Sequence, residues 1–117
     1  MTVDDVERQA LLAAADWAFI QYAEAVDKTE HTVKLRLYIA AECFVQVYAN
    51  TQKQLSSYTL IFNRMRIFGR DCDGGVWHRH PADDPDQHDF SAEGQRPVTL
   101  DEFLREAQQV LQSRSLL

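Results

Sequence analysis

Hydrophobic residues near the start of the chain recur at intervals of three and four, which is the period of one face of an α-helix. The residues on this face are Leu12, Ala15, Phe19, Tyr22 and Val26. Thr2 followed by Asp5 resembles a helix-capping pattern. The spacing predicts one amphipathic helix over residues 3–28, which we expect to pack on a sheet rather than to bind a partner.

Hydrophobic and polar residues alternate in the middle of the chain, which is typical of half-buried strands. The strands predicted from this pattern cover residues 32–40, 42–49, 57–62 and 65–71. Asn63 and Arg64 are expected to form a two-residue hairpin turn, because Asn accepts a positive φ. In the last strand, alternation places Arg66, Phe68 and Arg70 on one face.

Residues 72–98 show no periodicity and contain all three prolines and three of the four histidines. We expect a long irregular segment, and such loops are usually functional or disordered. Thr99 to Glu102 is a capping box that begins a closing helix. The predicted fold is therefore a single α+β domain, residues 1–117, in which a four-stranded antiparallel meander sheet is covered by an N-terminal and a C-terminal helix.

Composition places the chain among globular proteins, with 45% hydrophobic and 26% charged residues. No apolar run approaches the ~18 residues of a membrane helix, and the N-terminus carries acidic residues where a signal peptide carries basic ones. We therefore expect a cytoplasmic protein with no membrane association. The two cysteines have no CxxC spacing and are expected to be reduced.

The net charge is −6, but it is unevenly distributed: residues 1–27 carry −5, residues 28–80 carry +4 and residues 81–117 carry −5. A basic middle between acidic ends could form one basic face, or the ends could neutralise the middle in the fold. The predicted open face of the sheet mixes basic and aromatic residues, a combination that suits RNA but also occurs on solvated strands. These residues are Lys34, Arg36, Tyr38, Tyr48, Arg66, Phe68 and Arg70.

Candidate chemistry is concentrated between Arg64 and His88. Asp71, His78, His80 and His88 bring one carboxylate and three imidazoles into 18 positions. Histidine titrates near neutrality and can transfer protons, while arginine stabilises the charge on a reacting phosphate. RNA cleavage needs these groups: a base for the 2′-hydroxyl, an acid for the leaving oxygen and a cation beside the phosphate.

Two other interpretations fit the same residues. His78, His80 and His88 could bind a metal ion with Asp71 or Cys72 as a fourth ligand, although no CxxC or HExxH motif supports this. Alternatively, the histidines belong to a polar loop and serve only hydrogen bonding.

Three short motifs of the chain resemble the TumE family of bacterial toxins. They are the run from Tyr58 to Leu60, the run from Arg66 to Asp71, and the histidine-rich segment from His78 to Pro81 with a later His88. The resemblance covers roughly residues 32–110 and is strongest over 57–88. The family tends to have "PHHP" where this chain has Trp77 to Pro81, and a second histidine cluster where this chain has Pro85 to Asp89.

The resemblance implies the toxin of a type II toxin–antitoxin system, which acts by RNA cleavage or another block on translation. It implies a helix-turn-helix antitoxin as protein partner, with RNA or the ribosome as target. Exposed hairpin edges and the long apolar helix would also suit a homodimer. The alternatives are a non-catalytic protein-binding module and a small metalloprotein.

Residue roles follow from this hypothesis of a ribonuclease without a cofactor. Arg66 and Arg70 would hold phosphate, with Arg64 and Tyr58 completing the substrate-binding set. His78 and His80 would share the acid and base roles, and Asp71 would orient a histidine or pair with an arginine. His88 completes the candidate catalytic set.

Overall fold

The computed structural model describes all 117 residues and contains two helices and six strands. The elements in chain order are α1 (Val3–Asp16), β1 (Tyr22–Lys28), β2 (Thr32–Ala40), β3 (Cys43–Asn50), β4 (Leu55–Phe62), β5 (Met65–Asp73), β6 (Val76–His80) and α2 (Leu100–Ser113). The strands form one antiparallel sheet in the order β1-β2-β3-β4-β5-β6, so each strand pairs with its neighbour in sequence.

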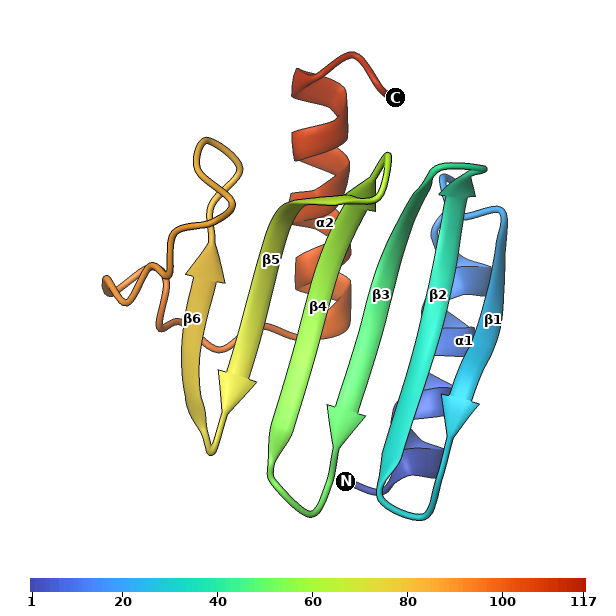
Figure 1. Cartoon of the computed structure of the whole chain (residues 1–117). Coiled ribbons are helices and arrows are strands. Elements are labelled where there is room, and N and C mark those ends of the chain that lie inside the picture. Colours follow the sequence, from blue (N-terminus) through green and yellow to red (C-terminus); the bar gives the residue numbers. More distant parts are fainter.

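Both helices cover the same face of the sheet, and the other face is open (Figure 1). Helix α1 lies against β1, β2 and β3, and α2 lies against β4 and β5. The α+β class and the antiparallel meander with two flanking helices are confirmed, but the sheet has six strands instead of four.

The hydrophobic core lies between the sheet and the two helices. Strands β2 and β3 bury every second residue, as their alternating pattern predicts. Helix α2 buries one stripe of its surface against the sheet. The main core residues are Val33, Leu35, Leu37, Val45, Val47, Leu60, Phe103, Leu104, Ala107 and Leu111.

The prediction of a single helix over residues 3–28 is wrong beyond Asp16. Helix α1 ends where Trp17 adopts an extended conformation, and the chain turns back to form β1. The helical spacing of Tyr22 and Val26 is overridden because β1 satisfies its backbone groups by pairing with β2. Lys28 then joins the end of β1 to α1 through ion pairs with Asp4 and Glu7.

The prediction of an irregular segment over residues 72–98 is also wrong in part. Strand β5 continues to Asp73, and residues 76–80 form β6. Gly74 and Gly75, with φ values of 59° and 89°, form the two-residue turn between the two strands. Glycine adopts positive φ without a steric penalty, so this Gly-Gly pair allows a tight hairpin.

Other local predictions are confirmed. Asn63 and Arg64 both have positive φ, 55° and 69°, and form the hairpin turn between β4 and β5. Capping boxes begin both helices, with Thr2 paired to Asp5 and Thr99 paired to Glu102. Neither helix is long and apolar enough to cross a lipid bilayer.

Candidate functional site

The register of the sheet arranges the side chains of the open face in rows that run across the strands, because directly paired residues point to the same side. The aromatic row contains Tyr22, Tyr38, Phe44, Ile61 and Arg66. The His80 row contains Glu24, Arg36, Gln46, Thr59, Gly69 and His80. The His78 row contains Lys34, Tyr48, Ser57, Asp71 and His78.

A β-bulge in β5 changes the face on which two predicted site residues lie. Leu60 pairs with Phe68 while Ile61 pairs with Arg66, so Ile67 is an extra residue. Arg66 therefore stays on the open face, but Phe68 and Arg70 turn toward α2. The expectation that Arg66, Phe68 and Arg70 share the open face is wrong for this reason.

Three predicted catalytic residues meet where β5 pairs with β6. The Nε2 atoms of His78 and His80 lie 3.2 Å apart. Asp71 Oδ2 lies 3.4 Å from the first of these nitrogens and 3.2 Å from the second. Asp71 is paired with His78 across the two strands, and His80 follows His78 by two residues and so lies on the same face.

His88 reaches these residues from the loop after β6. Arg79 and Asp89 form an isolated antiparallel bridge, which runs the loop alongside β6 like a short additional strand. Because the bridge is antiparallel, His88 lies beside His80 and Phe90 lies beside His78. The ring of His88 lies 4.7 Å from that of His80, and Phe90 lies 5.2 Å from His78. We refer to Asp71, His78, His80 and His88 as the histidine cluster.

Hydrogen bonds fix the orientation of two members of the histidine cluster. His80 Nδ1 lies 3.0 Å from the carbonyl oxygen of Pro85, and this oxygen can only accept, so Nδ1 carries the proton. Nε2 of neutral His80 therefore presents a lone pair to the rest of the cluster. The hydroxyl of Ser57 donates to Asp71 Oδ1 at 2.7 Å, which leaves Oδ2 directed at the histidines.

The electrostatic environment favours neutral His80. Burial lowers its pKa below the ordinary value, and the positive charge of Arg66 lowers it further. His80 is 2% exposed, whereas His88 is exposed and His78 and Asp71 are half-buried. The stem of Arg66 passes over Gly69, where a Cβ would lie 3.5 Å from Arg66 Cδ and 3.6 Å from His80 Cβ. Arg66 is thus the predicted phosphate-binding arginine that lies beside the cluster.

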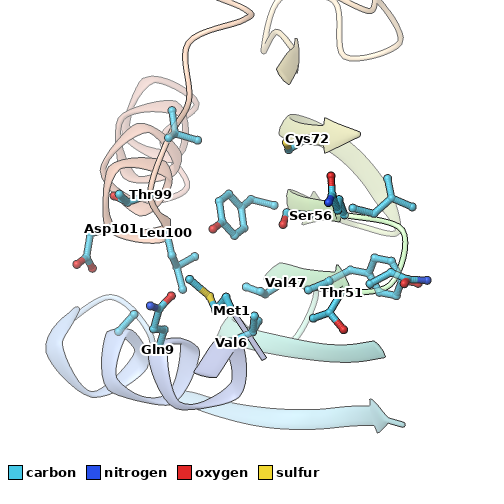
Figure 2. A pocket seen from close by; sticks show the side chains of 18 of the residues that line it. Met1, Val6, Gln9, Val47, Thr51, Ser56, Cys72, Thr99, Leu100 and Asp101 are labelled. Atoms are coloured by element: carbon cyan, nitrogen blue, oxygen red, sulfur yellow. The ribbon is translucent and has the colours of Figure 1, made fainter. Parts of the chain in front are cut away.

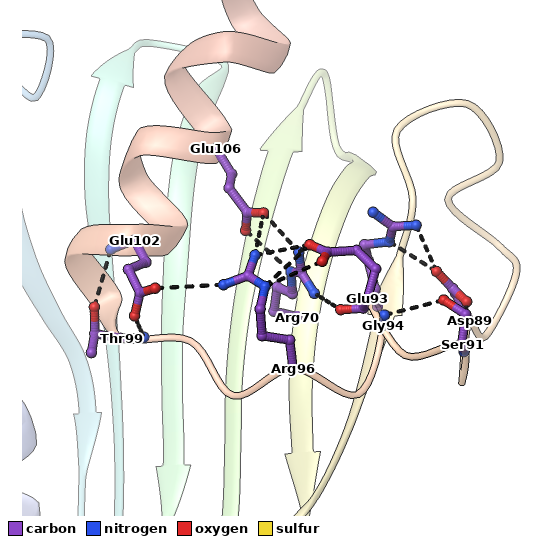
Figure 3. Close-up of polar contacts among 10 residues, drawn as sticks. Arg70, Asp89, Ser91, Glu93, Gly94, Arg96, Thr99, Glu102 and Glu106 are labelled. Atoms are coloured by element: carbon purple, nitrogen blue, oxygen red, sulfur yellow. Dashed lines mark hydrogen bonds and ion pairs between the residues drawn. The ribbon is translucent and has the colours of Figure 1, made fainter.

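Arg70 is instead completely buried on the helix side of the sheet (Figure 3). Its guanidinium donates to both carboxylate oxygens of Glu106 on α2, at 3.1 and 2.7 Å. It also donates to the carbonyl and the carboxylate of Glu93, at 2.7 and 2.9 Å. Arg96 binds the same two carboxylates. These contacts join β5, α2 and the loop between β6 and α2, so Arg70 has a structural position.

The structure also separates Tyr58 and Arg64 from the histidine cluster. Tyr58 lies on the helix side, with its ring 5.5 Å from that of Phe103, and burial raises the pKa of its hydroxyl. Arg64 is exposed in the β4–β5 turn and forms no hydrogen bond or ion pair with the cluster. Of the four predicted substrate-binding residues, only Arg66 is brought to the cluster.

A separate cleft of about 940 Å³ lies on the helix side, between the two helices and the middle strands (Figure 2). Its wall includes Val47 and Cys72 from the sheet, Val6 and Gln9 from α1, and Leu100 from α2. None of the histidines lines it, so the molecule has two distinct candidate surfaces. Cys72 opens into this cleft, on the side of the sheet opposite Asp71, and is therefore not a candidate ligand for the histidine cluster.

Sequence reasoning missed Ser57, Pro85 and Phe90. The Ser57 contact depends on strand register, which alternation alone does not specify. Pro85 and Phe90 depend on the path of an irregular loop, for which the sequence carries no periodic signal.

A scan against models of known families, a search of curated proteins and a search of solved structures each found no match to this chain.

Proposed function

We propose that the protein cleaves RNA at the histidine cluster and acts in the cytoplasm as the toxin of a type II toxin–antitoxin system. The observation that carries the proposal is the convergence of Asp71, His78 and His80 beside Arg66 on the open face of the sheet. A proton acceptor, a second imidazole and a cation thus lie within one small region, which is the set that RNA cleavage requires.

The proposed reaction needs no external nucleophile. The 2′-hydroxyl of a ribose loses its proton to the cluster, where the lone pair of His80 Nε2 is available. The 2′-oxygen then bonds to the neighbouring phosphorus as the bond from phosphorus to the 5′-oxygen breaks. The 5′-oxygen takes up a proton from His78, whose Nε2 lies 3.2 Å from that of His80, while the ring of exposed His88 lies 5.2 Å from the His78 ring. The products are a 2′,3′-cyclic phosphate and a 5′-hydroxyl.

The remainder of the open face has the composition of a surface for single-stranded RNA. Tyr22 stacks on Tyr38 with ring centroids 4.7 Å apart, and Tyr38 contacts Phe44 at 5.4 Å. The guanidinium of Arg36 lies 4.8 Å from the centre of the Phe44 ring. Aromatic rings stack on unpaired bases, and arginine and lysine bind the backbone. The aromatic row ends at Arg66, which lies beside His80. A single-stranded RNA bound along this row would therefore reach the histidine cluster.

The role as a toxin is supported by the resemblance to the TumE family, whose motif segments include Arg66, Asp71, His78, His80 and His88. On this proposal a helix-turn-helix antitoxin, encoded beside the toxin, neutralises it. Co-expression of the adjacent gene product should then restore growth and form a complex that co-purifies with the toxin. Failure of any neighbouring product to do so would contradict the toxin–antitoxin assignment but not RNA cleavage.

The decisive experiment compares growth and transcript integrity after induction of the wild-type chain, His78→Ala and His31→Ala. We expect the wild type and His31→Ala to arrest growth and fragment RNA, because His31 is exposed and remote in the fold. We expect His78→Ala to do neither, while its circular dichroism and melting temperature stay close to those of the wild type. If the purified wild type leaves RNA intact, or His78→Ala cleaves equally fast, RNA cleavage at this cluster is refuted.

A non-catalytic binding module is the second candidate function, and the helix-side cleft is the observation that favours it. Leu12 and Met1 are exposed at this cleft, where a partner could cover them. The variant Leu12→Arg distinguishes the two functions. If the protein is a binding module, the variant should no longer capture its partner. If the protein is the proposed ribonuclease, the variant should cleave RNA as fast as the wild type.

A further inference from the structure

The three facing atoms of the histidine cluster have the spacing of ligands around one metal ion. The three distances among His78 Nε2, His80 Nε2 and Asp71 Oδ2 are 3.2, 3.2 and 3.4 Å. Two ligands at Zn–N or Zn–O distances of about 2.0–2.2 Å in a tetrahedral site lie about 3.3–3.6 Å apart. The three atoms therefore form a nearly equilateral triangle of the size of one tetrahedral face.

The protons available do not satisfy these contacts. His80 Nδ1 donates to Pro85, so the Nε2 of the neutral ring is an acceptor, as is Asp71 Oδ2. His78 Nε2 can contribute one proton, which serves only one of its two neighbours. At least one contact between two lone pairs is left, in a region where His80 is 2% exposed. Such a contact is unfavourable unless a cation lies between the atoms.

We propose that Asp71, His78 and His80 bind a divalent transition-metal ion of the zinc class, with His88 beside the fourth coordination position. Two or three imidazoles with one carboxylate suit Zn²⁺ and the neighbouring first-row metals, whereas Mg²⁺ and Ca²⁺ prefer oxygen ligands. The ligand atoms of His78, His80 and His88 all lie within 4.8 Å of one another. His88 therefore lies close enough to the other two histidines to be a further ligand of the same ion.

The residues behind the three ligands support this assignment. Metal-binding histidines commonly donate their second ring N–H to a carbonyl or carboxylate, which fixes the tautomer and the ring orientation. His80 does so to Pro85. Metal-binding carboxylates are commonly hydrogen-bonded in turn, as Asp71 is to Ser57. Ser57 is held in place by its neighbour Thr59, at 3.2 Å.

The role of the ion rests on the proposed function, but its binding does not. A zinc-class ion lowers the pKa of bound water to about 7, which makes hydroxide available at neutral pH. In the proposed RNA cleavage, such an ion would supply a hydroxide as acceptor for the proton of the 2′-hydroxyl, while Asp71, His78 and His80 would hold the ion. His80 Nε2 then serves as a ligand instead of the direct proton acceptor.

The test measures metal binding directly on the tag-free, full-length protein. The apo protein is titrated with Zn²⁺ by calorimetry and with Co²⁺ by visible absorption, in which four-coordinate cobalt gives intense bands. We expect one ion per chain. Binding should weaken more than about 100-fold in His78→Ala and about 10-fold in Ser57→Ala, because residues behind the ligands usually contribute 10–100-fold. His31→Ala and Asp73→Asn, which change a histidine and an acidic residue outside the cluster, should bind like the wild type.

Several outcomes would overturn the inference. These are no stoichiometric binding, binding that His78→Ala leaves unchanged, or binding that His31→Ala removes. His78 is suited to the test because it is only partly buried and its replacement should leave the fold intact, which a melting curve verifies. Cleavage of RNA by a protein that binds no metal would refute the ion and retain the ribonuclease. Metal binding by a protein that does not cleave RNA would refute the ribonuclease and retain the metal site.

Discussion

At the residue scale, the location of Arg70 depends on one extra residue in β5. The bulge at Ile67 turns Arg70 away from the histidines and into the contact with Glu93 and Glu106. Strict alternation cannot reveal a bulge, so sequence reasoning assigned this arginine to the substrate. The guanidinium of Arg70 is fully buried and donates to both carboxylate oxygens of Glu106, which indicates a role in stability instead.

Replacing Arg70 by Met should lower the free energy of unfolding by about 3 kcal/mol, because Glu93 and Glu106 lose the buried one of the two arginines that they share. Urea denaturation measures the change. Arg105→Met provides the control, since Arg105 is an exposed arginine of α2. Equal stability of the two variants would show that the Arg70 contacts do not stabilise the fold.

Arg66 should respond in the opposite way. Arg66→Met keeps the stem that passes over Gly69 but removes the charge beside His80. We expect stability to change by less than about 0.5 kcal/mol. The rate of the proposed RNA cleavage should fall at least about 10-fold, since the proposed charge-assisted contact to phosphate is lost. A cleavage assay and a denaturation curve on the same preparation separate the two effects. Unchanged cleavage would remove Arg66 from the proposed site.

Arg64 offers a third test at this scale. Its φ of 69° is costly for a residue with a Cβ. Two-residue hairpin turns in which both residues have positive φ favour Gly at the second position, which Arg64 occupies. Arg64→Gly should therefore raise the free energy of unfolding by about 0.5–1 kcal/mol. Asn63→Ala should lower it, because Asn tolerates positive φ better than Ala. Thermal denaturation of the two variants measures whether each one raises or lowers the stability. Stabilisation by both substitutions would contradict this account.

At the scale of elements, local alternation predicts β2 and β3 because each has one buried face, and it also predicts most of β4 and β5. The boundary between α1 and β1 could not be predicted in the same way, since Phe19, Tyr22 and Val26 have helical spacing and only pairing with β2 decides against it. The sequence before β6 carries a usable signal in its Gly-Gly pair. If Gly74 and Gly75 are taken as a two-residue turn, counting outward pairs Asp71 with His78.

The loop after β6 positions His88 through a very close backbone approach. A Cβ on Gly94 would lie 2.0 Å from the carbonyl oxygen of Asp89, so only glycine fits there. Gly94→Ala should displace residues 89–94 and, through His88, weaken the proposed metal binding and the proposed RNA cleavage about 10-fold. Gln95→Ala changes an exposed side chain of the same loop and should have no effect. Wild-type affinity in Gly94→Ala would show that the cluster does not depend on this loop.

At the scale of the whole molecule, acidic loop residues should make stability depend on pH. Hydrogen bonds from Ser91, together with Arg79, lower the pKa of Asp89 to about 2, and Arg96 and Arg70 lower the pKa of Glu93 to about 2. In the unfolded chain both groups have ordinary pKa values near 4. Their contribution to stability is therefore complete above about pH 5 and disappears as the pH falls toward 2.

Urea midpoints measured between pH 6 and pH 2.5 should fall as the pH is lowered. Asp89→Asn should reduce this dependence, because the unfolded state then gains one proton fewer than before. Asp86→Asn, at an exposed carboxylate of the same loop, serves as the matched control. The same pH dependence in all three proteins would exclude Asp89 as a source of acid sensitivity.

The two outer strands of the sheet differ in how they are closed to strand addition. The Arg79–Asp89 bridge occupies part of the outer side of β6, while β1 carries a register shift near Val26 and charged residues at Glu24, Asp27 and Lys28. Irregular, charged or covered edges discourage pairing with another chain. A second copy therefore gains little by extending the sheet sideways. When the protein is produced in quantity, this design favours separate molecules over polymers built strand upon strand.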